Sequence, residues 1–309
     1  MTLTRKLSKL IIPGIISAGL LITGCSSDNA DSEKKKTDIS DEDYSEAVDY
    51  TITGIEPGAG ISVATEKALE EYDSLENWDV QLASTAAMLV ELDQAIEKEE
   101  PIIVTGWNPH WMFSKHPEMK YLEDPKGIYG GEETISTLVT TDLKDSKPNA
   151  YKVLDQFEWD IEDMEDIMYE AAEADKEIED VAKQWVADNK DKTSKWIEGV
   201  DDANGESVEL VSTPWDSEIA SSSVLKEVME SVGFDVKVTP VDVAIVFESL
   251  ANGDADATIA AWLPFTHAQF YEEHEDNFDD LGPNLHGAKI GLVVPEYMDI
   301  DSIEDLEAK

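Results

Sequence analysis

From about residue 50 to the C-terminus, apolar residues recur with two alternating periods. Short runs rich in β-branched residues, such as 51–55 and 208–212, are typical of buried strands. Longer stretches between them, such as 61–72 and 218–232, carry apolar residues at helical spacing. Strands that alternate with helices of this length predict parallel βαβ units with right-handed crossovers, and therefore an α/β fold.

The predicted elements form two copies of one pattern. Each copy has the order strand, loop, helix, strand, helix, strand and then a tryptophan. The later elements are expected at 79–83, 86–98 and 101–105 in the first copy, and at 235–240, 243–252 and 257–260 in the second. Trp107 follows Gly60 by 47 residues, and Trp262 follows Trp215 by the same number. A chance recurrence of ordinary α/β units is the alternative to a true repeat.

Two copies of the pattern predict two lobes with a ligand cleft between them. The expected boundaries are 47–142 for lobe I, with 290–309 crossing back towards it, and 143–289 for lobe II. Ligands of open α/β sheets bind beyond the carboxyl ends of the strands. Four positions lie in or beside a loop that follows a predicted strand: Gly60, Trp107, Trp215 and Trp262. We therefore expect all four to face the shared cleft.

The other tryptophans lie in a different context. Between the copies, 151–199 is acidic and has apolar residues at helical spacing. Trp159, Trp185 and Trp196 belong to this segment, and Trp78 precedes a predicted strand. We interpret these four side chains as core packing rather than ligand contacts.

The first 24 residues have the layout of a secretory signal peptide, with a basic start and a short apolar run at 10–21. The run is shorter than the roughly 20 residues that span a bilayer, although a single transmembrane anchor is the alternative. Residues 22–25 read Ile-Thr-Gly-Cys and resemble a bacterial lipobox, so we expect lipid attachment at Cys25. Residues 25–46 are polar and charged and predict a disordered acidic tether.

The charge of the chain excludes one class of partner. Its 69 acidic residues outnumber its 23 basic ones, which gives a formal net charge of −46. Nucleic acid would be repelled by this charge. The acidity favours solubility, and at roughly 1 M salt the Debye length of about 3 Å would screen the self-repulsion.

The chemistry of the strand-end tryptophans points to a cation. The face of an indole ring is the best side-chain surface for a cation, and a desolvated contact is worth about 2 kcal/mol. A quaternary ammonium group donates no hydrogen bonds and spreads its charge over methyl groups, so aromatic faces suit both its charge and its apolar surface. Trp107, Trp215 and Trp262 together predict a cage for such a group.

Other residues indicate a carboxylate at the opposite end of the ligand. The glycine-containing loop 58–61 immediately precedes a predicted helix, where free backbone N–H groups and the helix dipole favour an anion. The loop lacks the third glycine of a dinucleotide fingerprint, and the chain has no phosphate loop, which argues against nucleotides. His267 could donate a hydrogen bond to the carboxylate, although a lone histidine is more often structural.

An enzyme is the main alternative from another class. Ser223 and Lys226 match a Ser-x-x-Lys motif, but both lie within a predicted amphipathic helix, where chance matches are common. The chain has no glycine-flanked nucleophile elbow. Its five histidines show no tight metal-ligand spacing. We therefore expect no catalytic residue, no metal and no cofactor.

Four motifs carry a resemblance to a known family. They lie at 54–61 (GIEPGAGI), 105–113 (TGWNPHWMF), 215–221 (WDSEIAS) and 261–267 (AWLPFTH). They resemble the motifs of glycine betaine-binding lipoproteins of osmoprotectant ABC importers, and the resemblance extends from residue 50 to the end. One departure is 243–247, where close relatives often carry a further aromatic residue nearby.

The resemblance implies a two-lobed type II periplasmic-binding-protein fold that closes around its ligand by a hinge motion. The implied ammonium cage consists of Trp107, Trp215 and Trp262, and the implied carboxylate contacts are the backbone of Gly60 and Ile61 and the side chain of His267. It also implies a monomer, anchored at the outer face of the membrane, that delivers its ligand to the permease and ATPase subunits of the importer.

The choice of ligand within this class stays open. Glycine betaine, proline betaine and carnitine carry both an ammonium group and a carboxylate, whereas choline has no carboxylate to meet the predicted donors. A lipid-anchored sensory binding module is a further alternative, since the same binding chemistry would serve it.

Overall fold

The computed structural model describes residues 41–309, with the side chains from Tyr44 onward. The expected signal peptide at 1–24, the expected lipid attachment at Cys25 and most of the expected tether lie outside the described residues. Among residues 41–309, no helix combines the length and the apolar character needed to cross a membrane.

The C-terminal part of the expected tether is helical. Helix α1 (Asp41–Ala47) covers it, and Tyr44 is only 5% exposed. The Tyr44 hydroxyl donates to the Tyr297 carbonyl oxygen at 3.2 Å, and the Ser45 hydroxyl accepts from the Glu307 amide at 2.9 Å. The prediction of disorder is therefore wrong for 41–46, because these two side chains find partners near the C-terminus that are distant in sequence.

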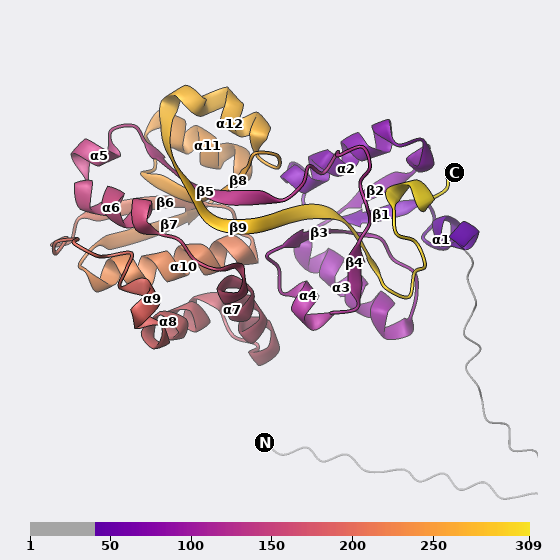
Figure 1. The fold of residues 1–309 in the computed structure, drawn as a ribbon, viewed down its shortest axis with the longest axis horizontal. Helices are drawn as coiled ribbons and strands as arrows, with labels where there is room; N and C mark the ends of the chain where they lie inside the picture. Colours follow the sequence, from indigo (N-terminus) through magenta and orange to yellow (C-terminus); the bar gives the residue numbers. More distant parts are fainter. Residues whose placement is uncertain (1–40) are drawn as a thin grey trace, which may run out of the picture. The chain divides into compact units, whose positions relative to one another are not determined.

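The remaining elements follow the predicted alternation closely (Figure 1). The first half contains β1 (Thr51–Gly54), α2 (Gly60–Glu71), β2 (Asp79–Leu82), α3 (Thr85–Lys98), β3 (Val104–Asn108), α4 (Met112–Lys115), β4 (Met119–Tyr121) and β5 (Glu133–Thr140). Short helices α5 (Leu143–Ser146), α6 (Pro148–Gln156), α7 (Ile161–Ala174), α8 (Ile178–Asp188) and α9 (Lys190–Thr193) follow. The second half contains β6 (Ser207–Ser212), α10 (Asp216–Ser231), β7 (Asp235–Pro240), α11 (Val243–Asn252), β8 (Ala257–Leu263), α12 (Ala268–His274) and β9 (Phe278–Pro295).

Local sequence signals account for several helix ends. Ser84 caps the N-terminus of α3, where its hydroxyl accepts from the Ala87 amide at 3.2 Å. Gly253 ends α11 in the left-handed conformation with φ of 73°, which favours glycine. Pro148 occupies the first turn of α6, where the absent N–H costs no helical hydrogen bond.

The strands form one nine-stranded sheet with two similar halves. The order is β2-β1-β3-β9-β5-β8-β6-β7, and β4 pairs with β9 beside this path. In each half the first strand pairs in parallel with the next two, β1 with β2 and β3, and β6 with β7 and β8. The 18-residue strand β9 is antiparallel to β5 at one end and to β3 at the other, so it runs through both halves (Figure 1). The predicted α/β fold is confirmed.

Strand β5 differs from its predicted place. It hydrogen-bonds to β8 and β9, with Ile135 opposite Trp262, and it makes no pairing with β1, β2 or β3. The expected lobe boundary at 142 would assign β5 to the first half, because it follows β4 in sequence. Its pairing assigns it to the second half, since β5 hydrogen-bonds to β8 on one side and to the first part of β9 on the other. We propose, on this pairing, that the two lobes divide before β5 and within β9.

The central tryptophans pack with one another. Trp159 and Trp196 are 6% and 4% exposed, and the Trp185 ring lies 6.0 Å from the first and 6.5 Å from the second. Trp78 is 5% exposed, and its indole N–H donates to the Glu307 carbonyl oxygen at 2.8 Å. The prediction of core packing is confirmed for Trp78, Trp159 and Trp196, and Trp185 is half-buried and packs against the core.

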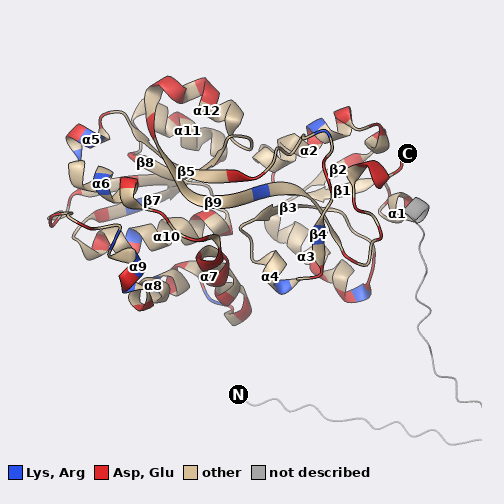
Figure 2. Ribbon diagram, viewed as in Figure 1, with Lys and Arg blue, Asp and Glu red and all other residues tan. Residues whose placement is uncertain are grey.

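Acidic residues are spread over the helices of both halves, and basic residues are few (Figure 2). Several lysines pair with them at the surface, as Lys176 does with Glu170 at 3.0 Å. Exposed pairs of this kind contribute little to stability, so the excess negative charge faces solvent without compensation.

Candidate ligand-binding site

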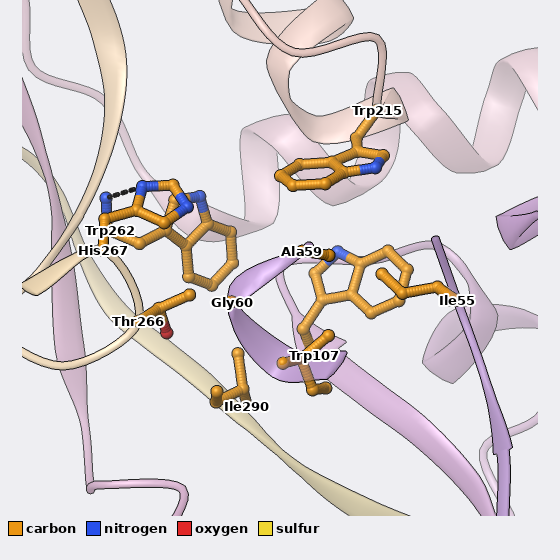
Figure 3. Close-up of a pocket in the computed structure, with 10 residues that line it drawn as sticks. Ile55, Ala59, Gly60, Trp107, Trp215, Trp262, Thr266, His267 and Ile290 are labelled. Atoms are coloured by element: carbon orange, nitrogen blue, oxygen red, sulfur yellow. Dashed lines mark hydrogen bonds between the residues drawn. The ribbon is translucent and has the colours of Figure 1, made fainter. Parts of the chain in front are cut away.

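A hollow of about 330 Å³, part of it open to solvent, lies where the two halves of the sheet meet (Figure 3). The hollow is lined by Ile55, Ala59, Gly60, Ile61, Trp107, Trp215, Trp262, Thr266, His267 and Ile290. All six side chains or backbone positions singled out from the sequence are therefore brought together here.

Three indole rings stand around this space (Figure 3). Trp107 belongs to β3, Trp262 to β8, and Trp215 is the residue that precedes α10. Trp107 and Trp262 are 6% and 3% exposed, whereas Trp215 is half-buried. The rings of Trp107 and Trp262 are thus fixed by the two halves of the sheet, and the Trp215 ring completes the enclosure from the start of a helix.

The indole of Trp262 is held from behind by an acidic side chain. Its Nε1 donates to Glu218 Oε1 at 2.9 Å, and Ser217 Oγ donates to Glu218 Oε2 at 2.6 Å. Glu218 is only 2% exposed. Burial raises the pKa of this carboxyl to about 7, and the two hydrogen bonds oppose the rise. The sequence did not predict Ser217 or Glu218 as residues of the site.

His267 presents a free donor to the hollow. Its Nδ1 accepts a hydrogen bond from the Trp262 amide at 3.1 Å (Figure 3), which assigns the proton of the neutral ring to Nε2. Burial lowers the pKa of His267 to about 3, so the ring is neutral at pH 7. Among the described residues Nε2 has no hydrogen-bond partner, although it is buried. An orphaned buried N–H of this kind suits a carboxylate acceptor.

His110 is the corresponding histidine after Trp107, but it does not line the hollow. Its Nδ1 accepts from the Met112 amide at 3.0 Å, and burial lowers its pKa to about 3. Its ring centroid lies 4.5 Å from that of Trp107 and 5.3 Å from that of Trp111. The side chain therefore packs against the cage ring instead of facing the ligand space.

The N-terminus of α2 reaches the hollow with its backbone. The N-cap residue Ala59 makes no side-chain capping bond, and the first turn contains no acidic residue. The first N–H groups of a helix have no partner within the helix. The amides of Gly60 and Ile61 are therefore available to an anion, and the helix dipole favours one there.

Gly60 lies at a close contact between the two halves. A Cβ atom at this position would lie 2.4 Å from Thr266 Cγ2 and 2.6 Å from the Thr266 carbonyl oxygen. Since the nearest backbone atom cannot be displaced cheaply, the observed approach requires glycine. The glycine thus serves the packing of α2 against the loop after β8 as well as access to its amide.

The loop after β8 is fixed by Glu133 from β5. The carboxylate accepts from the Phe265 and Thr266 amides at 3.3 and 3.0 Å and from the Thr266 hydroxyl. Burial raises the pKa of Glu133. Sequence reasoning missed Glu133, because its partners lie more than 130 residues away. It also missed Thr266, although the neighbouring residue His267 was predicted to lie at the site.

Two further hydrogen bonds join the halves beside the hollow. Trp111 Nε1 donates to Asp216 Oδ2 at 2.8 Å, and Asn108 Nδ2 donates to Glu165 Oε1 at 2.8 Å. Oδ1 of Asn108 accepts from the Tyr121 hydroxyl at 2.9 Å, which orients the side-chain amide. Side-chain hydrogen bonds therefore join the halves near the tryptophan rings.

Residues suggested for other chemistry lie apart from the hollow. The Lys226 amine donates to the Val236 carbonyl oxygen at 2.6 Å and to Glu230. It is thus engaged away from Ser223. Within residues 41–309, no group of three or more His, Cys, Asp or Glu side chains is arranged to hold a metal ion.

Comparison with known proteins gives matches over most of the chain. The family model for the substrate-binding domain of the ABC-type glycine betaine transport system, OpuAC, matches residues 27–188 and 206–309. The glycine betaine/carnitine transport binding protein GbuC of Listeria monocytogenes serotype 1/2a (strain 10403S) is 43% identical over 304 residues, which cover 97% of this chain and 99% of that protein.

Two solved structures are also similar. Lactococcal OpuAC, in a closed-liganded conformation with glycine betaine, is 42% identical, with 49% of this chain and 59% of that chain covered and a TM-score of 0.44. The glycine/betaine/L-proline-binding protein ProX from Borrelia burgdorferi is 33% identical, with 49% and 57% covered and a TM-score of 0.46.

Proposed function

Because the chain belongs to the family of substrate-binding domains of ABC-type glycine betaine transport systems, we propose that it captures glycine betaine outside the cytoplasm. It then delivers this ligand, chemically unchanged, to the permease and ATPase subunits of an ABC importer. As a compatible solute, the imported betaine would protect the cell against osmotic stress.

The observation that carries the proposal is the pairing of two opposite chemistries in one hollow. Three indole faces, from Trp107, Trp215 and Trp262, suit the trimethylammonium end. The neutral His267, with its free Nε2–H, and the start of α2 suit the carboxylate end. A zwitterion with both groups a single carbon apart satisfies both.

The magnitudes agree with a useful affinity. Three ring contacts at about 2 kcal/mol each contribute roughly 6 kcal/mol before ordering costs. Hydrogen bonds to a charged group add about 1.5–3 kcal/mol each. Micromolar binding corresponds to about −8 kcal/mol, so the ring contacts and the hydrogen bonds to the carboxylate must together exceed this value by the cost of association.

Carnitine is the second candidate ligand, since the Listeria relative is named for both glycine betaine and carnitine. Carnitine keeps the two charged ends but is longer than glycine betaine. Choline would leave the His267 and α2 donors without an acceptor.

The family places the protein outside the cytoplasm, and we propose a lipid anchor at Cys25 on the basis of the lipobox-like residues 22–25. Replacement of Cys25 by alanine is expected to release the protein from the membrane fraction and to abolish labelling by a radioactive fatty acid. Labelling of the Cys25→Ala protein would contradict the anchor but not the ligand.

The binding proposal is tested by isothermal titration of the purified chain, without residues 1–40, with glycine betaine, proline betaine, carnitine and choline. We expect glycine betaine to bind in the micromolar range and to quench or shift tryptophan fluorescence. Alanine at Trp107, Trp215 or Trp262 is expected to weaken this binding severely. Unchanged affinity in all three variants would refute the cage, and tightest binding of choline would refute the carboxylate contacts.

A further inference from the structure

Glu218 is a buried carboxylate without a basic partner in the described part of the chain. The ion pairs of α10 join Lys226 to Glu230 and Lys183 to Glu227, and neither reaches Glu218. Its hydrogen-bond donors are the Ser217 hydroxyl and the Trp262 indole. A buried charge without a counter-ion is costly, and within α10 only the positive end of the helix dipole offsets this cost.

The position of Glu218 relates it to the cage. Its Oε1 accepts from Nε1 of Trp262 at 2.9 Å, and the same indole lines the hollow. The indole N–H is a donor only, so this oxygen acts as the acceptor. A negative charge at the N–H edge of the ring increases the electron density of its face, which is the surface that attracts a cation.

We propose that Glu218 is a positioning residue of the cage, which orients Trp262 and supplies the buried negative charge that a bound quaternary ammonium group neutralises. This inference rests on the proposed function, because it requires a cation in the hollow. Glu218 itself does not line the hollow, so it acts through the Trp262 ring and through the electric field that it creates there.

The protonation of Glu218 then depends on the ligand. Burial and the neighbouring Asp216 raise the pKa of Glu218, to about 7 without ligand. A cation beside the Trp262 face favours the ionised form and lowers this pKa, so binding near pH 7 releases part of a proton. The nearest titratable group on β8 and its loop, His267, is neutral. The charged side chains lining the neighbouring hollow against α7, α8 and α10 are Asp175, Lys176, Glu177, Glu179 and Asp216.

The test compares Glu218→Gln with Glu227→Gln. Both replace a carboxylate of α10 by an amide, but Glu227 pairs with Lys183 at the surface. Each variant is titrated with glycine betaine and with tert-butylacetate, in which a carbon atom replaces the quaternary nitrogen and the positive charge is absent. Weak binding is measured by competition, in which one ligand displaces the other from the hollow and the change in tryptophan fluorescence is recorded.

We expect Glu218→Gln to weaken betaine binding by about tenfold, which corresponds to a shift of about one unit in a coupled pKa, and to leave tert-butylacetate binding unchanged. Glu227→Gln should change neither. Equal loss for both ligands would show that Glu218 serves packing alone and would overturn the proposal, as would no loss for either. Failure of the wild-type protein to bind betaine would instead refute the proposed function.

Two further measurements keep the outcome independent of folding defects. Titration of wild type at about pH 7 in buffers of different ionisation enthalpy should reveal proton release on betaine binding, and Glu218→Gln should abolish it. In a double-mutant cycle with Trp262→Phe, which retains an aromatic face but removes the indole N–H, the two losses should not add. Full additivity, or unchanged proton release in Glu218→Gln, would contradict a role through Trp262.

Discussion

The N-termini of α2 and α10 occupy equivalent places in the two copies of the repeat, yet they meet the hollow with opposite chemistry. Helix α2 begins with Gly60, has no side-chain cap and carries no acid in its first turn. Helix α10 follows Trp215 and carries Asp216 and Glu218 in its first turn. The positive end of the helix dipole is therefore open at α2 and compensated at α10.

This difference explains how a repeated fold can bind an unsymmetrical ligand. An uncompensated helix start favours an anion, whereas a helix start covered by an indole and two acids favours a cation. Different side chains at equivalent positions of the two helix starts thus separate the two ends of the site. The two histidines differ in a similar way, since His267 lines the hollow and His110 packs behind Trp107.

The largest effect on betaine affinity is expected from a substitution on the α10 side of the hollow. Trp215→Ala removes one of three ring faces and opens the hollow to water, so betaine affinity should fall by about a hundredfold. Isothermal titration measures the loss. Trp185→Phe is the matched control, because Trp185 packs against Trp159 and Trp196 away from the hollow. An equal loss in both variants would indicate a general folding defect.

The α2 side is tested by Gly60→Ala. The added methyl group would meet the Thr266 carbonyl oxygen at 2.6 Å, so the two halves could not approach as closely and betaine affinity should fall by about thirtyfold. Gly58→Ala is the control, since nothing lies within 4 Å of its added Cβ and its φ of 85° affects stability instead. Binding by Gly60→Ala at wild-type affinity would contradict the close approach.

The predicted contact with the carboxylate end of the ligand is tested by His267→Ala. Loss of a hydrogen bond to a charged acceptor should weaken glycine betaine binding by about tenfold, while any weak binding of choline, which has no carboxylate, should change little. Parallel titrations of the two ligands give the comparison. If both ligands lose affinity equally, His267 supports the fold of the loop and does not contact the carboxylate.

The two buried histidines also predict a dependence of stability on pH. The folded-state pKa of His110 and of His267 is about 3, below the ordinary value of 6.5. Below pH 6.5 the unfolded chain binds more protons than the folded chain, so the free energy of unfolding falls. At one pH unit below 6.5, each histidine lowers the free energy of unfolding by about 1.4 kcal/mol. Glu218 acts in the opposite direction, because its pKa is raised to about 7.

Urea denaturation of wild type and His267→Gln at pH 7 and at about pH 5.5 checks this dependence. The variant should lose less stability than wild type on acidification. An identical loss in the two proteins would mean that His267 becomes protonated within the folded state.

The smallest effect is expected from Asp216→Ala. It removes the hydrogen bond from Trp111 across the two halves and one acid from the first turn of α10. The bond stabilises the contact between halves without touching the hollow, so betaine affinity should fall by about threefold, mainly through faster dissociation. Stopped-flow fluorescence measures that rate, with Glu227→Ala as the control on the same helix. A slower dissociation would exclude a role for Asp216 in holding the halves together.

Much of the fold follows from periodicity within short segments. Strands β6, β7 and β8 begin within one residue of their expected positions, and α11 matches its expected range. Local patterns determine these elements because each needs only its own apolar face and its own turn residues. Helix α1 was missed for the opposite reason, since its contacts with Tyr297 and Glu307 are formed by residues more than 250 positions away.

The hollow was partly predictable from the sequence. Trp107, Trp215 and Trp262 could be selected because they recur at repeat spacing near strand ends. Glu133 and Glu218 could not be selected in the same way, because a glutamate in an acidic chain carries no distinguishing signal. Their hydrogen bonds appear only when β5, β8 and α10 are placed side by side.

The sequence by itself determined the α/β alternation, the repeat, and the residue types that suit an ammonium group and a carboxylate. Only the tertiary structure decided which half β5 joins, which histidine faces the hollow and which acids lie behind the tryptophans. The reason is physical. Periodicity and residue chemistry act within a few positions, whereas burial, hydrogen-bond partners and pKa values depend on groups that the chain brings together from distant segments.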